Sequence, residues 1–433
     1  MRSAVDRSVT RPSTRRPAVL VILVLLFAGC ASTVQPSTSR PPTVPPSPIA
    51  TSSQATVPSP TSTGTAEPTV QPTPRPMPRA SATASCVAST LASLTRAQVV
   101  GQLFMVGLPK DRLADATRAG ILAEHFGSVA FTTQSSAGVS ATRALTDSVQ
   151  ALATHATTGG IGFLVAANQE GGLIQGLSGP GFTPIPSALD QGALTPAVLK
   201  SRAAGWGREL LEAGVNVDLA PVADVVPTGT DAQNAPIGQL QREYGHDPAT
   251  VASHVVAFVH GMTAAGVAST AKHFPGLGRV AGNTDFTGDV VDDVTTRDDS
   301  DLLPFTRAVR AGVPFVMVSL ATYERIDPDH LAAFSPTVID GMLRSDIGFH
   351  GVVVSDALGA TAVAAIPPGT RAVDFIAAGG DLIIVNQVKP AIEMAIALRQ
   401  RAAADSAFAA RVRNAARRVL EAKDAAGLLP CSD

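Results

Sequence analysis

Short apolar runs rich in β-branched residues recur along the chain from residue 103 onwards, and alanine-rich segments with helical periodicity separate most of them. A short apolar run of this kind is typical of a strand that is buried on both faces. The runs expected to be strands are 103–106, 128–131, 161–166, 215–220, 268–272, 315–319, 352–355 and 382–385. The segments expected to be helices are 196–213, 250–265, 302–311, 335–344, 371–378 and 407–425. Eight strands that alternate with helices predict an α/β fold, a (β/α)8 TIM-type barrel.

Two of the predicted strands end in ionisable residues. The run 268–272 ends at Lys272, which His273 and a Pro-Gly turn follow, and the run 352–355 is followed directly by Asp356. A charged group at the end of a buried strand is costly unless it faces a cleft. A single strand-end Asp is more often the N-cap of the next helix. The coincidence of several such ends favours an active site at the carboxyl ends of the strands.

The first 30 residues have the layout of a secretory signal peptide. Their basic residues are Arg2, Arg7, Arg11, Arg15 and Arg16. An apolar stretch over 18–28 and Gly29-Cys30 follow. A cysteine directly after small residues resembles a bacterial lipobox, so we expect an exported protein that a lipid on Cys30 anchors to the outer face of the cell membrane. The alternative is an uncleaved membrane anchor, which places the chain on the same side.

Residues 31–85 are rich in Pro, Ser and Thr and contain almost no large apolar side chains. Such a segment cannot bury enough surface to offset the entropy of ordering, so we expect a disordered linker. Residues 86–433 are long enough for one large barrel domain. The formal net charge of −2 and the lack of a basic cluster outside the leader argue against a nucleic-acid partner.

Two cysteines besides Cys30 lie at opposite ends of the predicted barrel domain, at Cys86 and Cys431. Because a barrel brings its first and last elements together and free thiols are a liability in exported proteins, we expect these two to form a disulfide. Two free surface thiols are the alternative. Since no cysteine pair has the spacing of zinc ligands, we expect no bound metal.

Six segments carry motifs that are weak individually but specific in their order and spacing. They are 101–107 (GQLFMVG), 169–172 (QEGG) with 184–188 (PIPSA), 214–216 (GVN) with 220–224 (APVAD), 242–245 (REYG), 272–276 (KHFPG) and 348–356 (GFHGVVVSD). Together they resemble glycoside hydrolase family 3, and within it the single-domain bacterial β-N-acetylglucosaminidases. The resemblance covers nearly all of residues 95–430.

The resemblance implies a retaining glycosidase that removes terminal β-N-acetylglucosamine without a cofactor, with muropeptide-like fragments of peptidoglycan as the expected substrate and a monomer as the expected state. Asp356 matches the family nucleophile, which forms a covalent glycosyl-enzyme. Lys272, His273 and Arg242 match residues that bind sugar hydroxyls, and Asn168 stands where the family has a sugar-binding Asp. Asp224 is expected either to bind the sugar or to cap a turn.

The chain departs from the family pattern in the loop that carries the acid/base histidine. Thr287 stands in place of that histidine, and a threonine hydroxyl cannot transfer protons usefully near neutral pH. Asp285 retains the acidic position of the pair, so Asp285 is the expected acid/base and Asp289 the second candidate. Other departures from the family pattern are Leu277, Gly176, Leu320 and Ala357.

These departures leave two accounts of function. In the first, a loop carboxylate replaces the histidine and the chain is an enzyme. In the second, catalysis is impaired and the barrel binds sugars as a surface lipoprotein. The retained Asp356 favours the enzyme, because a pure binding protein has no need for a carboxylate beneath the anomeric carbon. A β-glucosidase or a glycoside phosphorylase on the same barrel is a third possibility.

Overall fold

The computed structural model describes residues 80–109 and 112–431. The predicted signal peptide, Cys30 and most of the predicted linker lie outside these residues. The first described helix, α1 (Ala80–Ser93), begins within the range that the sequence assigned to the linker. None of the helices in the described part combines the length and the apolar content needed to cross a membrane.

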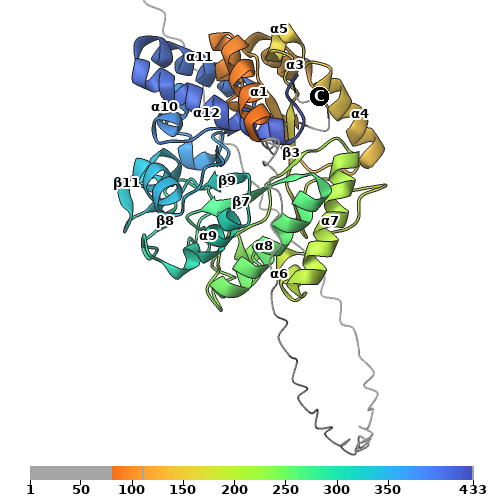
Figure 1. Cartoon of the computed structure of the whole chain (residues 1–433). Coiled ribbons are helices and arrows are strands. Elements are labelled where there is room, and N and C mark those ends of the chain that lie inside the picture. The colour runs from red at the N-terminus through yellow and green to blue at the C-terminus, as the bar shows by residue number, and fades with distance from the viewer. Residues whose placement is uncertain (1–79, 110–111, 432–433) are drawn as a thin grey trace, which may run out of the picture. The chain divides into compact units, whose positions relative to one another are not determined.

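Eight parallel strands form the barrel, which confirms the predicted fold. In their order around the sheet they are β12 (Val352–Ser355), β9 (Phe315–Val318), β7 (Ala268–Phe274), β6 (Val217–Asp218), β3 (Leu164–Ala167), β2 (Ser128–Phe131), β1 (Phe104–Leu108) and β13 (Ile383–Val385). An isolated parallel bridge between Val354 and Leu382 joins the two ends of this sheet. The sheet is therefore nearly closed, and helices surround it (Figure 1).

The remaining elements form the outer layer and the loops. The other helices are α2 (Arg96–Gly101), α3 (Asp115–Glu124), α4 (Val139–Gln150), α5 (His155–Thr158), α6 (Ala188–Gly192), α7 (Pro196–Glu212), α8 (Pro248–Ala265), α9 (Leu303–Arg310), α10 (Pro368–Ala377), α11 (Val388–Ala404) and α12 (Ser406–Ala425). The segment predicted as a helix over 335–344 is a π-helix, η5 (Thr337–Asp346). Short 3₁₀-helices are η2 (Gly238–Leu240), η3 (Ser300–Leu302), η4 (Ala332–Phe334) and η6 (Thr361–Val363).

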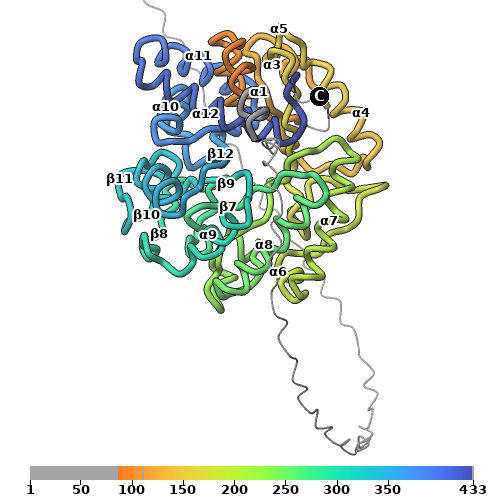
Figure 2. The backbone as a smooth tube through the Cα atoms, viewed as in Figure 1, coloured from red at the N-terminus to blue at the C-terminus, as the bar shows by residue number. Residues whose placement is uncertain are grey.

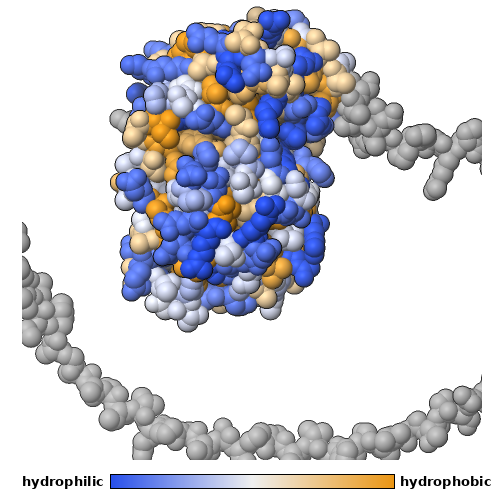
Figure 3. All heavy atoms as spheres, turned by 90° about the vertical axis from the view of Figure 1, so that its left-hand side faces the viewer, coloured by the Kyte–Doolittle hydropathy of each residue, from blue (hydrophilic) through white to orange (hydrophobic). Residues whose placement is uncertain are grey.

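The strands are buried on both faces because they separate two hydrophobic cores. Along β1, Met105 belongs to the smaller core inside the barrel, whereas Phe104 and Val106 belong to the larger core between strands and helices. This alternation follows from the two-residue period of a strand. On the outer surface in Figure 3, hydrophobic residues are interspersed with hydrophilic ones.

Local sequence signals explain where the best-defined helices begin and end. The side chain of Asp247 caps α8 by accepting hydrogen bonds from the backbone N–H groups of Ala249 and Thr250. Pro248 occupies the first turn, and Gly266 ends the helix with a φ of 83°, a conformation that favours glycine. Strand β7 therefore enters the barrel directly after a sharply terminated helix.

Two small sheets lie outside the barrel, in loops that follow its strands. β4 (Gln169–Gly171) and β5 (Ile174–Gln175) form a hairpin directly after β3, and they place Glu170 beyond the end of that strand. β8 (Val291–Asp292), β10 (Thr322–Tyr323) and β11 (Asp327–Leu331) pair across the loops that follow β7 and β9. These loops lie at the carboxyl ends of the strands, where barrel enzymes build their sites.

The first and last elements of the described chain are joined in two ways. The predicted disulfide between Cys86 in α1 and Cys431 is present, with a Cα–Cα distance of 5.9 Å. α1 packs against α12, and the two run close together in Figure 2. The buried Lys423 of α12 donates hydrogen bonds from Nζ to Gln102 Oε1 at 2.7 Å and to the backbone oxygens of Gly127 and Gly162.

Candidate active site

A cavity of about 300 Å³ opens at the carboxyl ends of the barrel strands. Residues near or just beyond the carboxyl ends of six strands line it: Phe131, Leu219, Lys272, Met317, Asp356 and Ile384. Most of the residues that the sequence proposed for the site line this cavity, namely Asp356, Asp285, Lys272, His273, Arg242 and Asn168. The fold thus brings together side chains that are up to 188 positions apart, from 168 to 356.

A buried carboxylate, Glu170, forms ion pairs with two cationic side chains that line the cavity. Its side chain accepts hydrogen bonds from Arg242 Nε at 2.7 Å and Arg242 Nη2 at 2.8 Å, and it pairs with Lys272 Nζ at 2.5 Å. Burial acts to raise the pKa of Glu170, but Arg242 and Lys272 outweigh burial and lower the pKa to about 2. Glu170 is therefore ionised and fixes both cations at the cavity wall.

Both cations keep donors that can serve a ligand. Lys272 Nζ also donates to Asn168 Oδ1 at 2.7 Å, so two of its three N–H groups are used. Arg242 donates from Nη1 to the carbonyl oxygen of Pro236 at 2.7 Å. The second N–H of Nη1 takes no part in this hydrogen bond and can donate to a ligand. Lys272, Asn168 and Arg242 therefore form a polar wall of the cavity. Glu170, which does not line the cavity, fixes the two cations of this wall.

Asp224 lies behind His273 and does not line the cavity. Its Oδ1 accepts hydrogen bonds from the backbone N–H groups of His273 and Leu277, and its Oδ2 lies 2.8 Å from His273 Nδ1. The carboxylate is fully buried, and it binds backbone N–H groups of the protein itself. With Nδ1–H directed at Asp224, His273 Nε2 carries the lone pair that faces Arg242 Nη2 at 3.5 Å.

Asp356 directly follows β12 and is half-buried at the cavity floor. Its backbone N–H donates to Val318 O of the neighbouring strand, and its Oδ1 accepts from the N–H of Ala357 at 2.8 Å. These contacts hold the carboxylate in place while leaving Oδ2 available. The negative charges of Glu170, Asp224 and Asp356 together raise the pKa of Arg242 against the opposing effect of burial. Arg242 therefore stays charged beside Asp356.

Asp285 reaches the cavity from the loop after β7. Its backbone oxygen accepts from Thr361 N at 3.3 Å, and Thr284 O accepts from Ala362 N at 3.1 Å, so the segment that follows β12 holds this loop. Loss of hydration and the nearby charge of Asp356 raise the pKa of Asp285 against the lowering effect of His273, Arg242 and Lys272. Thr287 and the second candidate Asp289 are absent from the cavity lining in the described part of the chain.

Three features of the cavity were missed in the sequence. Glu170 was noticed only as part of a motif, although its position directly before two glycines marked a turn near the strand ends. Asn386 and Thr132 line the cavity from the segments after β13 and β2, and nothing in their local sequence distinguishes them. Phe286, beside Asp285, is 79% exposed and also lines the cavity. It offers an aromatic face at the cavity mouth.

Comparisons with known proteins give a consistent result. The family described as "Glycosyl hydrolase family 3 N terminal domain" matches residues 95–422. A beta-hexosaminidase from Stenotrophomonas maltophilia (strain R551-3) is 33% identical over 235 residues, which are 51% of this chain and 66% of that protein. A beta-hexosaminidase from Alkalilimnicola ehrlichii is 33% identical over 292 residues, 65% of this chain and 79% of that protein.

Solved structures agree with this result. The crystal structure of a beta-N-acetylhexosaminidase from Beutenbergia cavernae DSM 12333 is 50% identical and superposes with a TM-score of 0.75 over 76% of this chain and 98% of that one. The structure of a beta-N-acetylglucosaminidase from Paenibacillus sp. str. FPU-7 is 29% identical, with a TM-score of 0.71 over 77% of this chain and 63% of that one.

Proposed function

Because this chain belongs to glycosyl hydrolase family 3, we propose that it is a retaining β-N-acetylhexosaminidase that removes a terminal β-linked N-acetylglucosamine. The observation that carries the proposal is the pair of carboxylates, Asp356 and Asp285, that face one cavity from two different loops. A retaining glycosidase needs two carboxyl groups with different protonation states. We infer the identity of the sugar from the relatives, which are named beta-hexosaminidase and beta-N-acetylhexosaminidase.

The two carboxyl groups have distinct roles in the proposed reaction. Asp356 Oδ2 attacks the anomeric carbon, and the bond from that carbon to the glycosidic oxygen breaks. Asp285, whose pKa is raised, gives its proton to the departing oxygen. In the second step Asp285 accepts a proton from water, the water oxygen bonds to the anomeric carbon, and Asp356 is released.

The polar wall binds the sugar. Lys272 and Arg242 keep N–H groups that can donate to ring hydroxyls, and Asn168 and His273 line the same side of the cavity. Because Glu170 and Asp224 orient this wall before a ligand arrives, little reorganisation is needed on binding. Phe286 can cover the apolar face of the ring from the mouth of the cavity.

The setting of the reaction forms a second part of the proposal. The leader with Cys30, followed by residues 31–79, suits an exported lipoprotein that acts as a monomer at the outer face of the membrane. Muropeptide-like fragments of peptidoglycan would be the amino-sugar substrates in that location. Labelling of Cys30 with a fatty acid analogue in a bacterial host, and loss of the label in Cys30→Ala, tests the anchor.

Chromophore release tests the proposed reaction. We expect the full chain to hydrolyse an aryl β-N-acetylglucosaminide, and Asp356→Asn to lower kcat at least 10³-fold because the nucleophile is lost. Mass spectrometry of a quenched reaction should find the sugar on Asp356. Tight binding of N-acetylglucosamine without turnover would instead make the chain a sugar-binding protein. Faster turnover of an aryl β-glucoside, or turnover that requires phosphate, would reassign the substrate or the reaction.

A further inference from the structure

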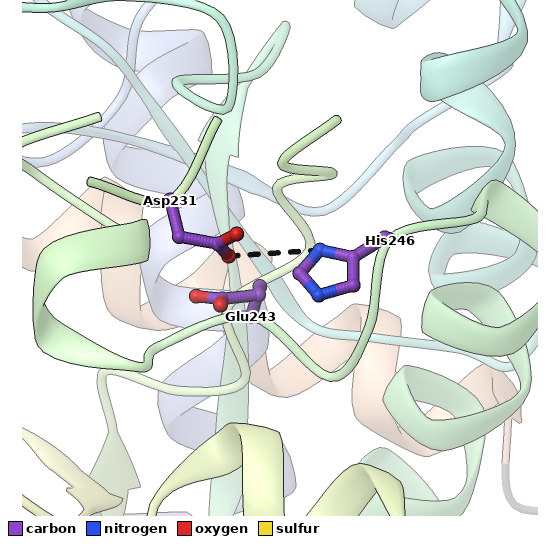
Figure 4. A group of neighbouring side chains, drawn as sticks. All are labelled: Asp231, Glu243 and His246. Atoms are coloured by element: carbon purple, nitrogen blue, oxygen red, sulfur yellow. Dashed lines mark ion pairs between the residues drawn. The ribbon is translucent and has the colours of Figure 1, made fainter. Parts of the chain in front are cut away.

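A second cluster of titratable side chains lies outside the cavity, on the segments that flank η2. Asp231 precedes η2, and Glu243 and His246 follow it (Figure 4). One potential ligand atom from each of the three lies within 4.8 Å of the other two. The Asp231 carboxylate faces the His246 ring, with Oδ1 3.7 Å from Nδ1. None of the three lines the candidate active site.

Glu243 is the unusual member of this cluster. Its side chain is 0% exposed, and neither carboxylate oxygen meets a hydrogen-bond donor from another described residue. Asp231 Oδ1, which faces the same point, is also buried without a hydrogen bond. A buried carboxylate without a donor or a cation is costly, and native proteins rarely leave one unpaired.

Other buried carboxylates in the described chain show what Glu243 lacks. Glu170 binds Arg242 and Lys272, Asp224 accepts two backbone hydrogen bonds, and Asp381 pairs with Arg344 and Arg418. The titratable groups that stand beside Glu243 in the described chain are a second carboxylate and an imidazole. The group that would satisfy two carboxylates and one imidazole together is a cation.

We propose that Asp231, Glu243 and His246 bind a divalent transition-metal ion of the Zn²⁺ class. Zn²⁺ accepts imidazole nitrogen together with carboxylate oxygen, whereas Ca²⁺ and Mg²⁺ prefer oxygen alone. Ligands about 2.1 Å from a tetrahedral ion lie about 3.4 Å apart, so small side-chain rotations bring the three atoms into range. Cysteine spacing, on which the expectation of no metal depends, gives no information about this site, because none of its three side chains is a cysteine.

The surroundings of His246 fit this role. Its Nδ1 lies 3.1 Å from the carbonyl oxygen of Val226. Binding of the ion through Nε2 would leave Nδ1–H donating to that carbonyl, which is the usual second contact of a metal-bound histidine, and it requires the Asp231 carboxylate to turn from Nδ1, which it faces here, towards Nε2.

The ion would stabilise one wall of the active site. The segment between Asp231 and Glu243 contributes Pro236 and Leu240 to the cavity, and Arg242 directly precedes Glu243. A bound ion would connect the two ends of this segment. Such a connection lowers the conformational entropy of the segment when it is unfolded, and so favours its folded form. The role is structural, since no cluster residue lines the cavity.

Metal binding to the full chain, purified without a polyhistidine tag and treated with EDTA, tests this proposal. After dialysis against Zn²⁺, we expect elemental mass spectrometry to find about one ion per chain and Zn²⁺ to raise Tm, because it binds the folded state. Ca²⁺ should leave Tm unchanged. Glu243→Gln and His246→Gln should each weaken Zn²⁺ binding at least tenfold.

A matched control is available at the surface. The exposed His330 pairs with the partly buried Asp327, with Asp327 Oδ1 3.0 Å from His330 Nδ1, outside any three-residue cluster found in the described chain. The variant His330→Gln should therefore keep wild-type Zn²⁺ binding. Zn²⁺ bound equally by wild type and His246→Gln would refute the proposal. The absence of bound Zn²⁺ in the wild type would also refute the proposal. A proton shared between the Glu243 and Asp231 carboxylates would then take the place of the ion. Since His246 is only half-buried, its variant is informative even if Glu243→Gln fails to fold.

Discussion

At the scale of single residues, the unusual feature of this site is that Thr287 stands where the family pattern has a histidine, while Asp285, two positions earlier, is retained. Thr287 is not among the described residues that line the cavity, whereas Asp285 and Asp356 both line it. Burial, followed by the nearby charge of Asp356, raises the pKa of Asp285, so Asp285 keeps its proton to higher pH. This direction supports the proposed role of Asp285 as the acid.

The variant Asp285→Asn should separate acid catalysis from nucleophilic attack. We expect kcat/KM to fall about 10²–10⁴-fold on substrates with poor leaving groups and much less on activated aryl substrates, which need no proton. Asp289→Asn in the same loop should leave both classes unchanged. Steady-state kinetics on a series of leaving groups checks this, and equal losses on all members would exclude Asp285 as the acid.

The variant Glu170→Gln should weaken sugar binding and lower the stability of the fold above pH 4.5. The folded pKa of about 2 lies below the ordinary 4.5, so the ionised group stabilises the fold above pH 4.5 and this contribution is lost as pH falls towards 2. The shift corresponds to about 3 kcal/mol. We expect KM to rise about tenfold and the unfolding free energy to become less dependent on pH below 4.5. Urea unfolding at several pH values measures this, with the exposed Glu324→Gln as control.

At the scale of elements, two loops from non-adjacent positions in the sequence bring together the proposed catalytic pair. The loop after β7 carries Asp285, and the segment after β12, with η6, holds it through Thr361 N and Ala362 N. Strands β7 and β12 both pair with β9, so their loops approach each other at the barrel mouth. The barrel order thus determines which loop can support the acid.

The variant Thr361→Pro should loosen this support without unfolding η6. Proline is tolerated at the first position of a helix, and Ala360 has the extended conformation (φ −66°, ψ 160°) that a residue before proline adopts. Only the N–H that donates to Asp285 O is lost. We expect kcat to fall several-fold with a Tm change below about 2 °C, whereas Thr361→Ala, which keeps the N–H, should behave as wild type. An unchanged kcat in Thr361→Pro would show that this contact does not position the acid.

At the scale of the whole molecule, closure of the barrel depends on contacts between its first and last elements. The disulfide Cys86–Cys431 spans 345 positions of sequence, and Lys423 joins α12 to residues Gln102, Gly127 and Gly162 at the start of the barrel. Both hold together segments that are adjacent only in the folded state. They oppose opening of the barrel between α1 and α12.

The double variant Cys86→Ser/Cys431→Ser should therefore be less stable than the wild type by about 2–5 kcal/mol, because the unfolded chain regains freedom. Urea unfolding measures the difference, and reductant should lower the wild type to the level of the variant. Turnover at 25 °C should be unchanged, since the cavity lies at the strand ends. A variant as stable as the wild type would mean that α1 and α12 need no covalent link.

Much of the barrel was predictable because buried parallel strands read as apolar runs. All eight predicted runs coincide with barrel strands, although only Val217–Asp218 of the run 215–220 is a strand. The helices α3 and α4 were missed because polar residues obscure their apolar periodicity, and α11 was missed because alanines blur its apolar face. The segment 335–344 was expected to be helical, but its winding as a π-helix was not foreseen.

The strand pattern, the ionisable strand ends at Lys272 and Asp356, and the motifs of the family are all legible in the sequence, because these signals are local and periodic. The folded structure was needed to show that Asp285 reaches the cavity, that Asp224 lies behind His273, and that Glu170 holds two cations. It also decided that Glu243 is buried beside Asp231 and His246. Such arrangements depend on which loops the closed barrel brings together, and distances between loops are not encoded in the spacing of residues along one chain.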